Sequence, residues 1–371
     1  DDFLVSNDTS ISILQVDKPN LVFIFLESWS ADNIGILGGL NNCSPQFDRL
    51  CNEGLLFTQT YANAYVSDQG IPAVLSAAPA VSRVAIINQP AKVHGLPCIS
   101  EEFRQLGYHT SFLYGGELIF GNLKGYLHEK GFHTLIEQSD LDQYPKGSLG
   151  VHDEYMFPEL LQQLNASKPP FMQCFFTTSS HMPYDFTPSD NWQSDPKDPE
   201  KKYTEACHYS DIHLGKFFVE AKKQAWYKNT LFVVVADHSH NTIRQWSNAN
   251  PKHSHIPLLF LGGALKEEWK GKQWAKKVSQ LDIASTILHQ WKLSSARYRY
   301  SRNMLHPSTP SSAYYIFYGG QGYLDDKGFA SMRQGSSIVE TDMTDSTEIN
   351  KAFAKAVSFQ QLIYEQLKQK K

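Results

Sequence analysis

Two apolar runs of the sequence end directly in residues that can bind a metal ion. Residues 21–26 are followed by Glu27, and residues 231–236 are followed by Asp237 and His238. Both runs are rich in β-branched and aromatic residues without polar alternation, which is typical of buried strands in a parallel sheet. The carboxyl ends of such strands meet at one edge of the sheet, where ligands bind. We therefore expect Glu27, Asp237 and His238 to lie close together.

A divalent cation is the partner that best accounts for such a group of side chains. A carboxylate that closes a buried strand is costly unless another group pairs with it. Two carboxylates and one imidazole form a mixed oxygen and nitrogen ligand set, which suits Mn²⁺, Mg²⁺ or Zn²⁺ better than a soft metal. Taken singly, Glu27 could cap a helix, and Asp237 with His238 could form a turn. Taken together, the three residues predict a metal site.

A polar turn elsewhere in the chain offers a nucleophile. Residues 64–71 lead into Pro72, and proline in a first helical turn predicts that a helix begins at Ile71 and Pro72. Ser67 would then lie just before the partly positive end of that helix. A serine hydroxyl bound to a metal ion can ionise near neutral pH and attack phosphorus or sulfur. The alternative is that Ser67 or Asp68 only caps the helix.

Two histidines are candidates for contact with a substrate. His181 follows a predicted strand at residues 171–177 and therefore lies at the same carboxyl edge. There it could hydrogen-bond a substrate oxygen or protonate a leaving group; a loop histidine with local hydrogen bonds is the competing interpretation. His255 opens the predicted strand at residues 256–261, close in sequence to His238, and is a second candidate for the same pocket.

The elements that position these residues alternate between strand and helix. Further strands are predicted at residues 56–60 and 109–114, and helices at residues 46–53, 71–76, 99–106, 153–164, 203–222 and 278–289. The alternation predicts an α/β fold with a mostly parallel central sheet that is sandwiched by helices. Asp153 opens one of these helices, and we interpret it as a structural cap.

The pattern changes towards the end of the chain. Short strands with Gly and Asp turns are predicted at residues 313–319, 322–325 and 329–333, followed by an amphipathic helix from residue 348 to the end. We therefore divide the chain into a lead-in at residues 1–18, a catalytic domain at residues 19–295 and a small C-terminal α+β subdomain at residues 296–371.

The composition excludes several classes of protein. The chain has 371 residues, 41% hydrophobic and 19% charged, so it is not disordered, collagen-like or a coiled coil. Its net charge of -4 argues against a nucleic-acid partner. The five cysteines have no C-x-x-C spacing, which argues against a zinc ribbon or a redox dithiol and favours free thiols over a Cys43–Cys51 disulfide. The longest apolar runs are far shorter than a bilayer-spanning helix.

Several segments resemble motifs of the alkaline phosphatase/sulfatase superfamily, in the order expected for it. They are a first metal motif at residues 19–28 (PNLVFIFLES), the segments at 44–50 and 53–58 that lead to the nucleophile loop, a substrate-histidine motif at 178–183 (TSSHMP) and a second metal motif at 236–238 (ADH). The branch that the chain resembles most is the lipoteichoic acid synthase-like group of membrane-anchored, sulfatase-fold proteins. The resemblance covers residues 18–295.

The resemblance implies roles for the residues at matching positions. Glu27, Asp237 and His238 match metal ligands, and His181 matches a substrate-binding histidine. Ser67 matches the nucleophile, usually a threonine in this branch, which is also a metal ligand. The cofactor implied is one divalent cation, with Mn²⁺ favoured and Mg²⁺ or Zn²⁺ as alternatives.

The same resemblance implies a function and a location. The usual reaction of the branch moves a phosphoglycerol group from phosphatidylglycerol through a covalent phospho-enzyme. The expected partners are therefore a phospholipid head group or another phosphate or sulfate ester. A segment like residues 114–122 contacts the head group in this branch, which makes Glu117 and Asn122 candidates for substrate binding. The resemblance also implies an N-terminal membrane anchor upstream of this sequence, with the catalytic domain on the extracytoplasmic side of a bacterial membrane, in the periplasm or at the cell surface.

Two positions depart from the pattern of the branch. Many members have an arginine just before the nucleophile and a basic residue two positions after it, where this chain has Val66 and Gln69. Without these charges three functions stay open: a phosphoglycerol-type transferase, a hydrolase of the phosphodiesterase or sulfatase type, and a catalytically weakened protein that binds a head group. A formylglycine-dependent sulfatase is not expected, because the chain has no Cys-x-Pro-x-Arg motif.

Overall fold

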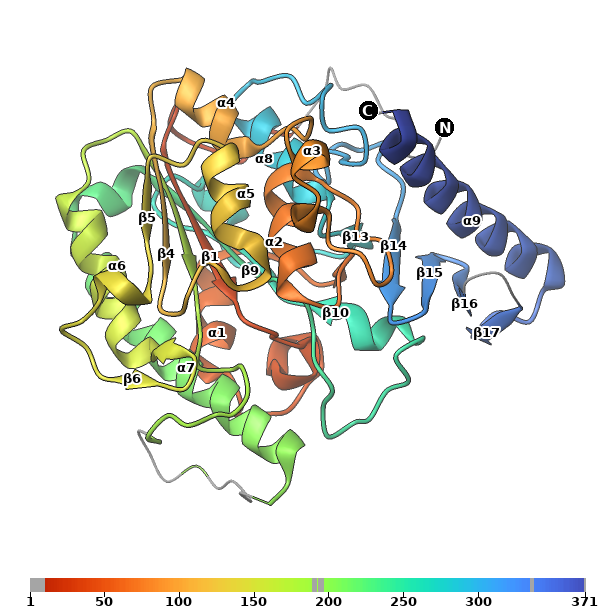
Figure 1. The fold of residues 1–371 in the computed structure, drawn as a ribbon, viewed down its shortest axis with the longest axis horizontal. Coiled ribbons are helices and arrows are strands. Elements are labelled where there is room, and N and C mark those ends of the chain that lie inside the picture. Colours follow the sequence, from red (N-terminus) through yellow and green to blue (C-terminus); the bar gives the residue numbers. More distant parts are fainter. Residues whose placement is uncertain (1–10, 189–191, 193–196, 334–336, 370–371) are drawn as a thin grey trace.

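The computed structural model describes residues 11–188, 192, 197–333 and 337–369. The main feature of this part of the chain is an eight-stranded sheet (Figure 1). Its strands are, in spatial order, β12 (Lys272–Trp274), β2 (Gly54–Phe57), β11 (Leu258–Leu261), β9 (Thr230–Ala236), β1 (Asn20–Leu26), β8 (Phe171–Phe176), β4 (His109–Tyr114) and β5 (Thr134–Ile136).

The centre of the sheet is parallel. Strands β9, β1, β8, β4 and β5 all run in one direction, and β1 lies between β8 and β9. All residues of β1, β8 and β9 are buried, as expected for strands that are covered on both faces. The buried strands predicted at residues 21–26, 171–177 and 231–236 are therefore confirmed.

Two layers of helices enclose the sheet (Figure 1). Helices α1, α6 and α7 pack against one another on one side, and α2, α4, α5 and α8 cover the other. The predicted α/β class with a helix-sandwiched, mostly parallel sheet is confirmed. The bounds are α1 (Pro45–Leu50), α2 (Ser67–Ser76), α3 (Pro90–Val93), α4 (Ile99–Gln105), α5 (Leu123–Glu129), α6 (Asp153–Ala166), α7 (Pro199–Ala221) and α8 (Asp282–Gln290).

Two predicted strands are each divided in the structure. Pro257 separates β10 (His255–Ile256) from β11, and β11 runs antiparallel to both β9 and β2. The strand predicted at residues 56–60 corresponds to β2 and to β3 (Thr60–Tyr61), which pairs with β10 and β13 (Val278–Ser279) in a separate small sheet. Another small sheet joins β6 (Lys146–Gly147) and β7 (Gly150–Val151). The helix predicted at residues 278–289 begins at Asp282, because residues 278–279 form β13.

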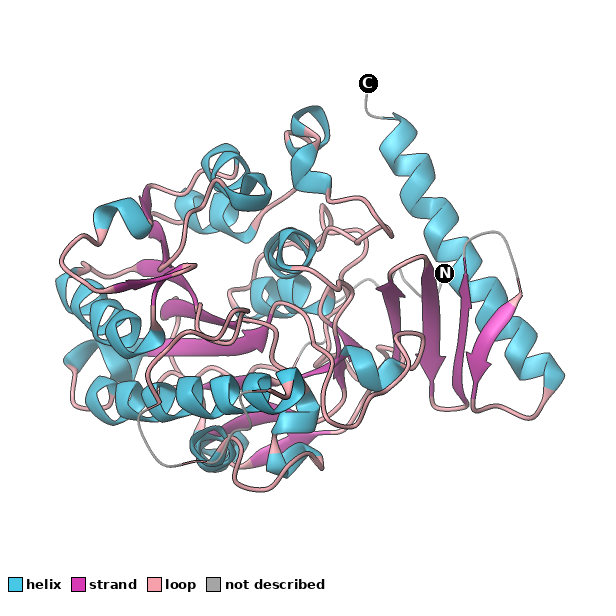
Figure 2. Cartoon of the chain, turned by 60° about the horizontal axis from the view of Figure 1, so that its bottom comes forward, coloured by secondary structure: helices cyan, strands magenta, loops and turns pink. Residues whose placement is uncertain are grey.

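The C-terminal part forms its own sheet, covered by one helix, beside the main body (Figure 2). Strands β14 (Ser312–Phe317), β15 (Gly320–Asp325), β16 (Gly328–Arg333) and β17 (Ile338–Thr341) make an antiparallel sheet, and α9 (Ser346–Gln369) packs on it. The predicted α+β character of this part is confirmed, although β17 was not predicted. Its core includes Tyr314, Tyr323 and Phe359, and the rings of Tyr314 and Phe359 lie 4.3 Å apart.

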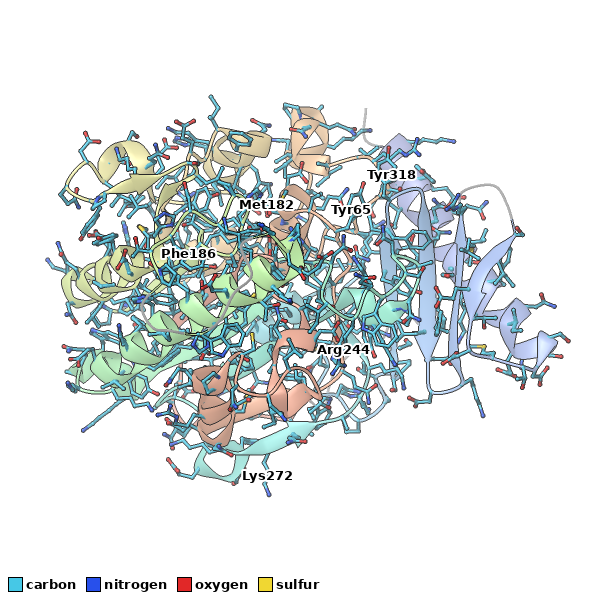
Figure 3. The ribbon with its side chains drawn as sticks, turned by 90° about the horizontal axis from the view of Figure 1, so that it is seen from below. Tyr65, Met182, Phe186, Arg244, Lys272 and Tyr318 are labelled. Atoms are coloured by element: carbon cyan, nitrogen blue, oxygen red, sulfur yellow. The ribbon has the colours of Figure 1, made fainter. Side chains whose placement is uncertain are left out.

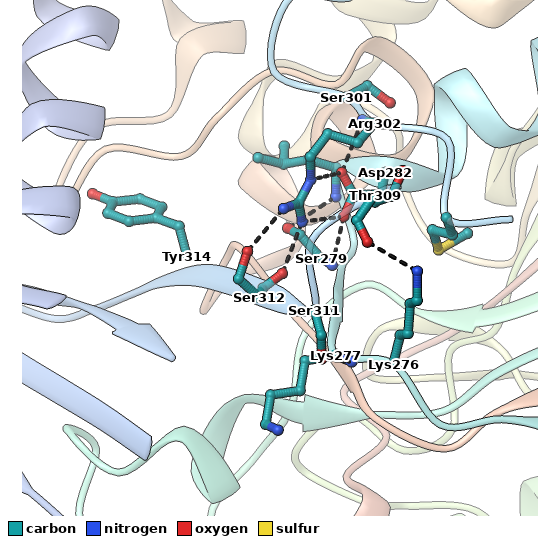
Figure 4. A network of polar contacts seen from close by, with 12 residues as sticks. Lys276, Lys277, Ser279, Asp282, Ser301, Arg302, Thr309, Ser311, Ser312 and Tyr314 are labelled. Carbon is teal, nitrogen blue, oxygen red and sulfur yellow. Dashed lines mark hydrogen bonds and ion pairs between the residues drawn. The ribbon is translucent and has the colours of Figure 1, made fainter. Parts of the chain in front are cut away.

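A buried ion pair ties this part to the main body (Figure 4). Nη2 and Nε of Arg302 donate to the two carboxylate oxygens of Asp282, at the start of α8, at 2.7 and 3.1 Å. Nη1 donates to Ser312 Oγ, at the start of β14. Arg302 and Asp282 are almost completely buried. A bidentate ion pair of this kind fixes the orientation of the two side chains as well as the distance between them.

The predicted lead-in contacts the main body where it is described. Its residues 1–10 lie outside the described residues. Ile13 N–H donates to Gln290 Oε1 at 2.8 Å, and Leu14 forms a bridge with Leu265. All five cysteines are free and buried, as favoured from their spacing. Among the described helices, none combines the length and apolar character needed to cross a membrane.

Candidate metal and nucleophile site

The ends of two neighbouring strands bring the predicted ligands together. β1 and β9 are paired in register, with Leu26 opposite Ala236, so the residues that follow each strand are neighbours. One ligand atom from each of Glu27, Asp237 and His238 lies within 4.8 Å of the other two. All three side chains are buried, and Asp237 has no exposed surface. The cluster predicted from the two strand ends is therefore present.

Hydrogen bonds from the turn after β1 orient the two carboxylates. Ser28 has a positive φ of 60°, which turns the chain sharply after Glu27. Its N–H donates to Asp237 Oδ1 at 2.8 Å, and its hydroxyl donates to Glu27 Oε1 at 2.5 Å. The Glu27 N–H donates to Thr177 Oγ1, after the neighbouring strand β8, at 2.8 Å. The turn thus holds both carboxylates in fixed positions.

The remaining ligand atoms fit a cation. Asp237 Oδ2 is buried and accepts no hydrogen bond within the described part of the chain; His238 Nε2 lies 3.4 Å from it. His238 Nδ1 lies 2.7 Å from the Ser239 carbonyl. Since a carbonyl only accepts, Nδ1 carries a proton, and in the neutral ring Nε2 keeps its lone pair. An unpaired carboxylate oxygen beside an imidazole lone pair is the donor set that borderline divalent ions bind.

The electrostatics of the cluster also indicate that a positive charge is missing. Burial, and then the nearby Asp237 carboxylate, raise the pKa of Glu27 to about 7. Burial acts to lower the pKa of His238, but the Asp237 and Glu27 carboxylates outweigh it, so the pKa is raised. Both shifts reflect two buried carboxylates without a full counter-charge, which a divalent cation supplies.

Ser67 lies beside this cluster, at the first position of α2. Its Oγ is 3.3 Å from Glu27 Oε2 and 3.4 Å from His238 Nε2. The prediction that the helix begins at Ile71 and Pro72 was wrong, because the Val66 carbonyl already accepts from the N–H groups of residues 69 and 70. Val66 is the N-cap and makes no side-chain capping bond. Ser67 is thus inside the first turn and is not a cap.

Close packing of α2 on the end of β9 determines where Ser67 lies. A Cβ atom at Gly70 would lie 2.0 Å from the Asp237 carbonyl oxygen, so only glycine allows this approach. Gln280, just before α8, donates its side-chain amide to the carbonyls of Ala236 and Asp237 at 3.0 and 2.6 Å. These contacts connect the helix that carries Ser67 to the residue that carries the second carboxylate.

A cavity of about 400 Å³ opens next to the cluster. Glu27 and Ser67 form part of its wall, together with Val66, Asp68, Tyr114, Glu117, Phe120, Gly121, Leu123, Gln138, Ser148, Leu149, Phe176 and His181. The wall combines apolar side chains with polar and acidic ones. The cavity can therefore receive a ligand with a polar head and an apolar body.

His181 lies in the wall of this cavity on the exposed loop after β8, next to Met182 (Figure 3). Its Nδ1 lies 2.7 Å from the Met182 carbonyl and is therefore protonated. The loop before it is held by Asp153, whose Oδ1 accepts from the Thr178 N–H at 2.9 Å and whose own N–H donates to Ser179 Oγ. Asp153 was predicted to be a helix cap only, whereas the structure makes it an anchor of the loop that carries His181.

The other predicted substrate residues differ in their placement. Glu117 is exposed and lines the cavity. Asn122 is not among the lining residues; its amide donates to the Ile87 carbonyl at 2.5 Å. His255 is also absent from the lining. Its Nε2 donates to the Thr58 carbonyl at 2.9 Å, and its ring stacks on Tyr61, because it belongs to the small sheet of β10 and β3. The structure thus places Asn122 and His255 outside the wall of this cavity, and their role in substrate binding stays a prediction.

Several residues of the cavity wall belong to segments that the sequence analysis named, but were not singled out there. Tyr114 and Phe120 belong to the predicted head-group segment at residues 114–122. Tyr114 ends β4 and so occupies the same carboxyl edge as Glu27, and Phe120 is 74% exposed. Asp68 lines the cavity with a buried, unpaired Oδ1, and burial raises its pKa.

Known proteins share this fold and these segments. The family model described as Sulfatase matches residues 19–292. The chain is 22% identical over 305 residues to lipoteichoic acid synthase 2 of Bacillus subtilis, which covers 74% of this chain and 45% of that protein. It is 24% identical over 311 residues to phosphoglycerol transferase I of Salmonella typhi, which covers 77% of this chain and 39% of that protein. The chain thus spans less than half the length of these two relatives.

A solved structure is similar over nearly the whole chain. It is that of a protein in the alkaline phosphatase superfamily from Vibrio parahaemolyticus, with a TM-score of 0.82 and 27% identity over 96% of this chain and 90% of that one. The resemblance that the motifs predicted is confirmed: the chain belongs to the sulfatase family of enzymes.

Proposed function

We propose that this protein is a metal-dependent phosphotransferase that moves a phosphoglycerol-type group from a phospholipid through a covalent intermediate on Ser67. The observation that carries the proposal is the position of Ser67 Oγ, within 3.4 Å of both Glu27 and His238 and at the wall of a cavity. The names of the two relatives favour phosphoglycerol chemistry. The membrane anchor and the extracytoplasmic location that the resemblance implies are also part of this proposal.

The cation would be held by Glu27, Asp237, His238 and Ser67, and Mn²⁺ is favoured over Mg²⁺ or Zn²⁺. When bound, it lowers the pKa of a hydroxyl and stabilises negative charge that develops on the transferred group. The chain supplies the rest of the site. The N-terminus of α2 places partly positive backbone N–H groups near Ser67, and the Ser67 hydroxyl donates to Glu27 Oε2.

The transfer is a two-step substitution at phosphorus. In the first step a bond forms between Ser67 Oγ and phosphorus, and the bond from phosphorus to the lipid alcohol breaks; the hydroxyl proton leaves toward Glu27. His181, in the wall of the cavity, is placed to give a proton to the departing alcohol. In the second step an acceptor hydroxyl oxygen bonds to phosphorus while its proton passes to His181. The Ser67 Oγ–phosphorus bond breaks, and the proton held by Glu27 returns to Ser67.

The covalent intermediate gives the proposal a direct test. Protein incubated with Mn²⁺ and phosphatidylglycerol should gain the mass of one phosphoglycerol group, and the Ser67→Ala variant should not. Ser148→Ala is the matched control, because Ser148 lines the same cavity but hydrogen-bonds Asp185 instead of the ligand cluster; it should gain the adduct. Wild-type protein that binds Mn²⁺ by elemental analysis but gains no adduct would overturn the covalent route.

Two other functions predict different results in the same experiment. A hydrolase forms the adduct and loses it in buffer without any acceptor. A protein that only binds a head group gains no adduct but still binds Mn²⁺ and lipid. The second function is favoured by one observation: Val66 carries no charge, and Gln69 turns its amide toward the carbonyls of Val81 and Val84 instead of the cavity.

A further inference from the structure

The cavity beside Ser67 has an acidic wall. Its described lining residues include the carboxylates of Glu27, Asp68 and Glu117 and the imidazole of His181, but neither a lysine nor an arginine. Glu27 belongs to the metal cluster, where a divalent cation would balance its charge. The charges of Asp68 and Glu117 are left over. Since they repel the negative charge of a phosphodiester, they act against a donor lipid that carries no positive charge.

Neither Asp68 nor Glu117 has a partner for its carboxylate within the part of the chain that the structure describes. Asp68 Oδ1 is buried and accepts no hydrogen bond there, and Glu117 is exposed and forms no ion pair. The base that lies nearest in sequence, Lys124, pairs with Glu137, whose Oε2 also accepts from the Leu118 N–H at 2.8 Å. A buried carboxylate oxygen without a donor is costly unless a ligand supplies one.

The loop that carries Glu117 lies directly against the residue that follows the nucleophile. Gly121 has a φ of 59°, and a Cβ atom at this position would lie 3.0 Å from Asp68 Cβ. Ser67, Asp68 and Glu117 therefore line one space of about 400 Å³, and a group bound at Ser67 shares that space with both carboxylates.

Aromatic rings complete this wall. Tyr114 and Phe176 are paired at the ends of β4 and β8, and their rings stack with 5.0 Å between the centroids. Phe120 lies on the same loop as Glu117. The faces of aromatic rings attract ammonium groups, and carboxylates accept their N–H bonds. A glycerol hydroxyl can also donate to a carboxylate, but it carries no charge that would offset Asp68 and Glu117.

We propose that the cavity selects a phosphodiester whose head group carries a primary ammonium, which binds Asp68 and Glu117 beside the aromatic rings. A primary ammonium is favoured over a trimethylammonium, because only the former has N–H bonds for Asp68 Oδ1. This inference rests on the proposed transfer through Ser67 and refines its donor. The glycerol group was taken from the names of two relatives, whereas the charges of the wall belong to this chain. The ammonium only binds: the bonds formed and broken at phosphorus, and the protons moved, are those of the two steps given above.

The first test compares soluble head-group esters by calorimetry. It uses Ser67→Ala protein, where no adduct can form, with Mn²⁺ loading checked by elemental analysis. Glycerophosphoethanolamine should bind about fivefold more tightly than glycerophosphoglycerol, as one partly exposed charge pair allows. Glu117→Gln should remove most of this preference, and Asp68→Asn is a second variant with the same expected effect. Glu268→Gln is the matched control, because Glu268 is an exposed glutamate outside the cavity wall; it should keep the preference.

Two results of this comparison would overturn the inference. One is equal affinity for the two esters, or a preference that survives both Glu117→Gln and Asp68→Asn. The other is glycerophosphocholine binding as tightly as glycerophosphoethanolamine, which would show that no N–H bond to Asp68 Oδ1 is needed.

The second test separates this inference from the transfer itself. Wild-type protein with Mn²⁺ is incubated with vesicles that contain equal amounts of phosphatidylethanolamine and phosphatidylglycerol, whose adducts on Ser67 differ in mass. The phosphoethanolamine adduct should form faster, and Glu117→Gln should reduce its excess about fivefold. An adduct from phosphatidylglycerol alone would overturn the inference and leave the transfer standing. If neither lipid gives an adduct but the preference for the ethanolamine ester persists, the transfer fails and the ammonium site stands.

Discussion

The Asp237→Asn substitution separates a metal ligand from a structural carboxylate. Asparagine keeps the shape of the side chain and an acceptor for the Ser28 N–H, which donates to Oδ1 at 2.8 Å. It removes the negative charge and replaces Oδ2, the buried oxygen without a hydrogen bond, by an amide group. If Asp237 binds a cation, the metal-free variant should be more stable than the metal-free wild type. Added metal should also stabilise the variant less than it stabilises the wild type.

The size of the effect follows from the geometry of the cluster. Ligand oxygens of Glu27 and Asp237 lie within 4.8 Å of each other. At an effective dielectric constant of about 20, two unit charges at that distance repel by about 3.5 kcal/mol. His238 offsets part of this repulsion, so metal-free Asp237→Asn should gain about 1–3 kcal/mol at pH 8, where Glu27 with its pKa of about 7 is ionised. Mn²⁺ at about 100 times its Kd should stabilise wild-type protein by about 2.7 kcal/mol.

Urea unfolding of chelator-treated protein, with and without added Mn²⁺, measures both quantities. Asp237→Asn should gain little from Mn²⁺. The control is Asp211→Asn: Asp211 is a buried aspartate of α7 whose two oxygens accept from the N–H groups of Gln46 and Phe47. Whatever its change in stability without metal, this variant should keep the full Mn²⁺ effect. The reasoning is refuted if Asp237→Asn is destabilised without metal and Mn²⁺ stabilises it as much as the wild type.

Three further substitutions test the contacts that shape the site and its surroundings. Gly70→Ala places a Cβ 2.0 Å from the Asp237 carbonyl oxygen and should cost about 1–3 kcal/mol and weaken Mn²⁺ binding in calorimetry; unchanged affinity would show that α2 does not position Ser67. Arg302→Met leaves Asp282 buried without its partner and should cost about 3–5 kcal/mol in urea unfolding, whereas the added Asp282→Asn change should recover much of the loss. Burial lowers the pKa of His213 to about 4, below its unfolded value of about 6.5, so the protein should lose stability as the pH falls from about 6.5 to 4. His213→Phe should reduce that loss by about 2 kcal/mol. Identical pH profiles of stability for variant and wild type would contradict this.

The cluster of Glu27, Asp237 and His238 was predictable because it depends on one simple rule of sheet geometry. Two apolar runs that end in ligand residues become adjacent parallel strands, and their register places residues 27 and 237 side by side. The fold class followed from the same runs, since strands buried on both faces need helices on both sides. Sequence alone did not show that β11 runs against its neighbours, because strand direction depends on the path of the chain and not on local pattern.

The start of α2 shows why local rules can mislead. Proline is common in the first turn of a helix, and Pro72 therefore suggested a start at Ile71. The helix instead begins at Ser67, with Pro72 inside it, because tertiary contact at Gly70 holds the preceding residues in place. The error matters for chemistry, since it moves Ser67 from outside the helix into its first turn.

Residues with roles set by distant partners were the ones that the sequence could not assign. Asp153 anchors the loop of His181 through Thr178, which is 25 residues away. Asn122 and His255 had the right chemistry for substrate contact, but each already satisfies a backbone carbonyl, of Ile87 and Thr58 respectively. Nothing in the local sequence of these residues indicates which carbonyl lies nearby.

The departure from the branch pattern at position 69 is connected to a nearby turn in the structure. A basic residue at position 69 would add positive charge close to Ser67, and this chain has Gln69 instead. Its amide binds two carbonyls of the turn that carries Arg83, so the residue that lacks the charge holds in place a segment that has one. Gln69→Leu leaves both carbonyls without this donor and should cost about 1–3 kcal/mol in urea unfolding. A Gln69→Leu protein with wild-type stability would show that Gln69 does not hold the turn.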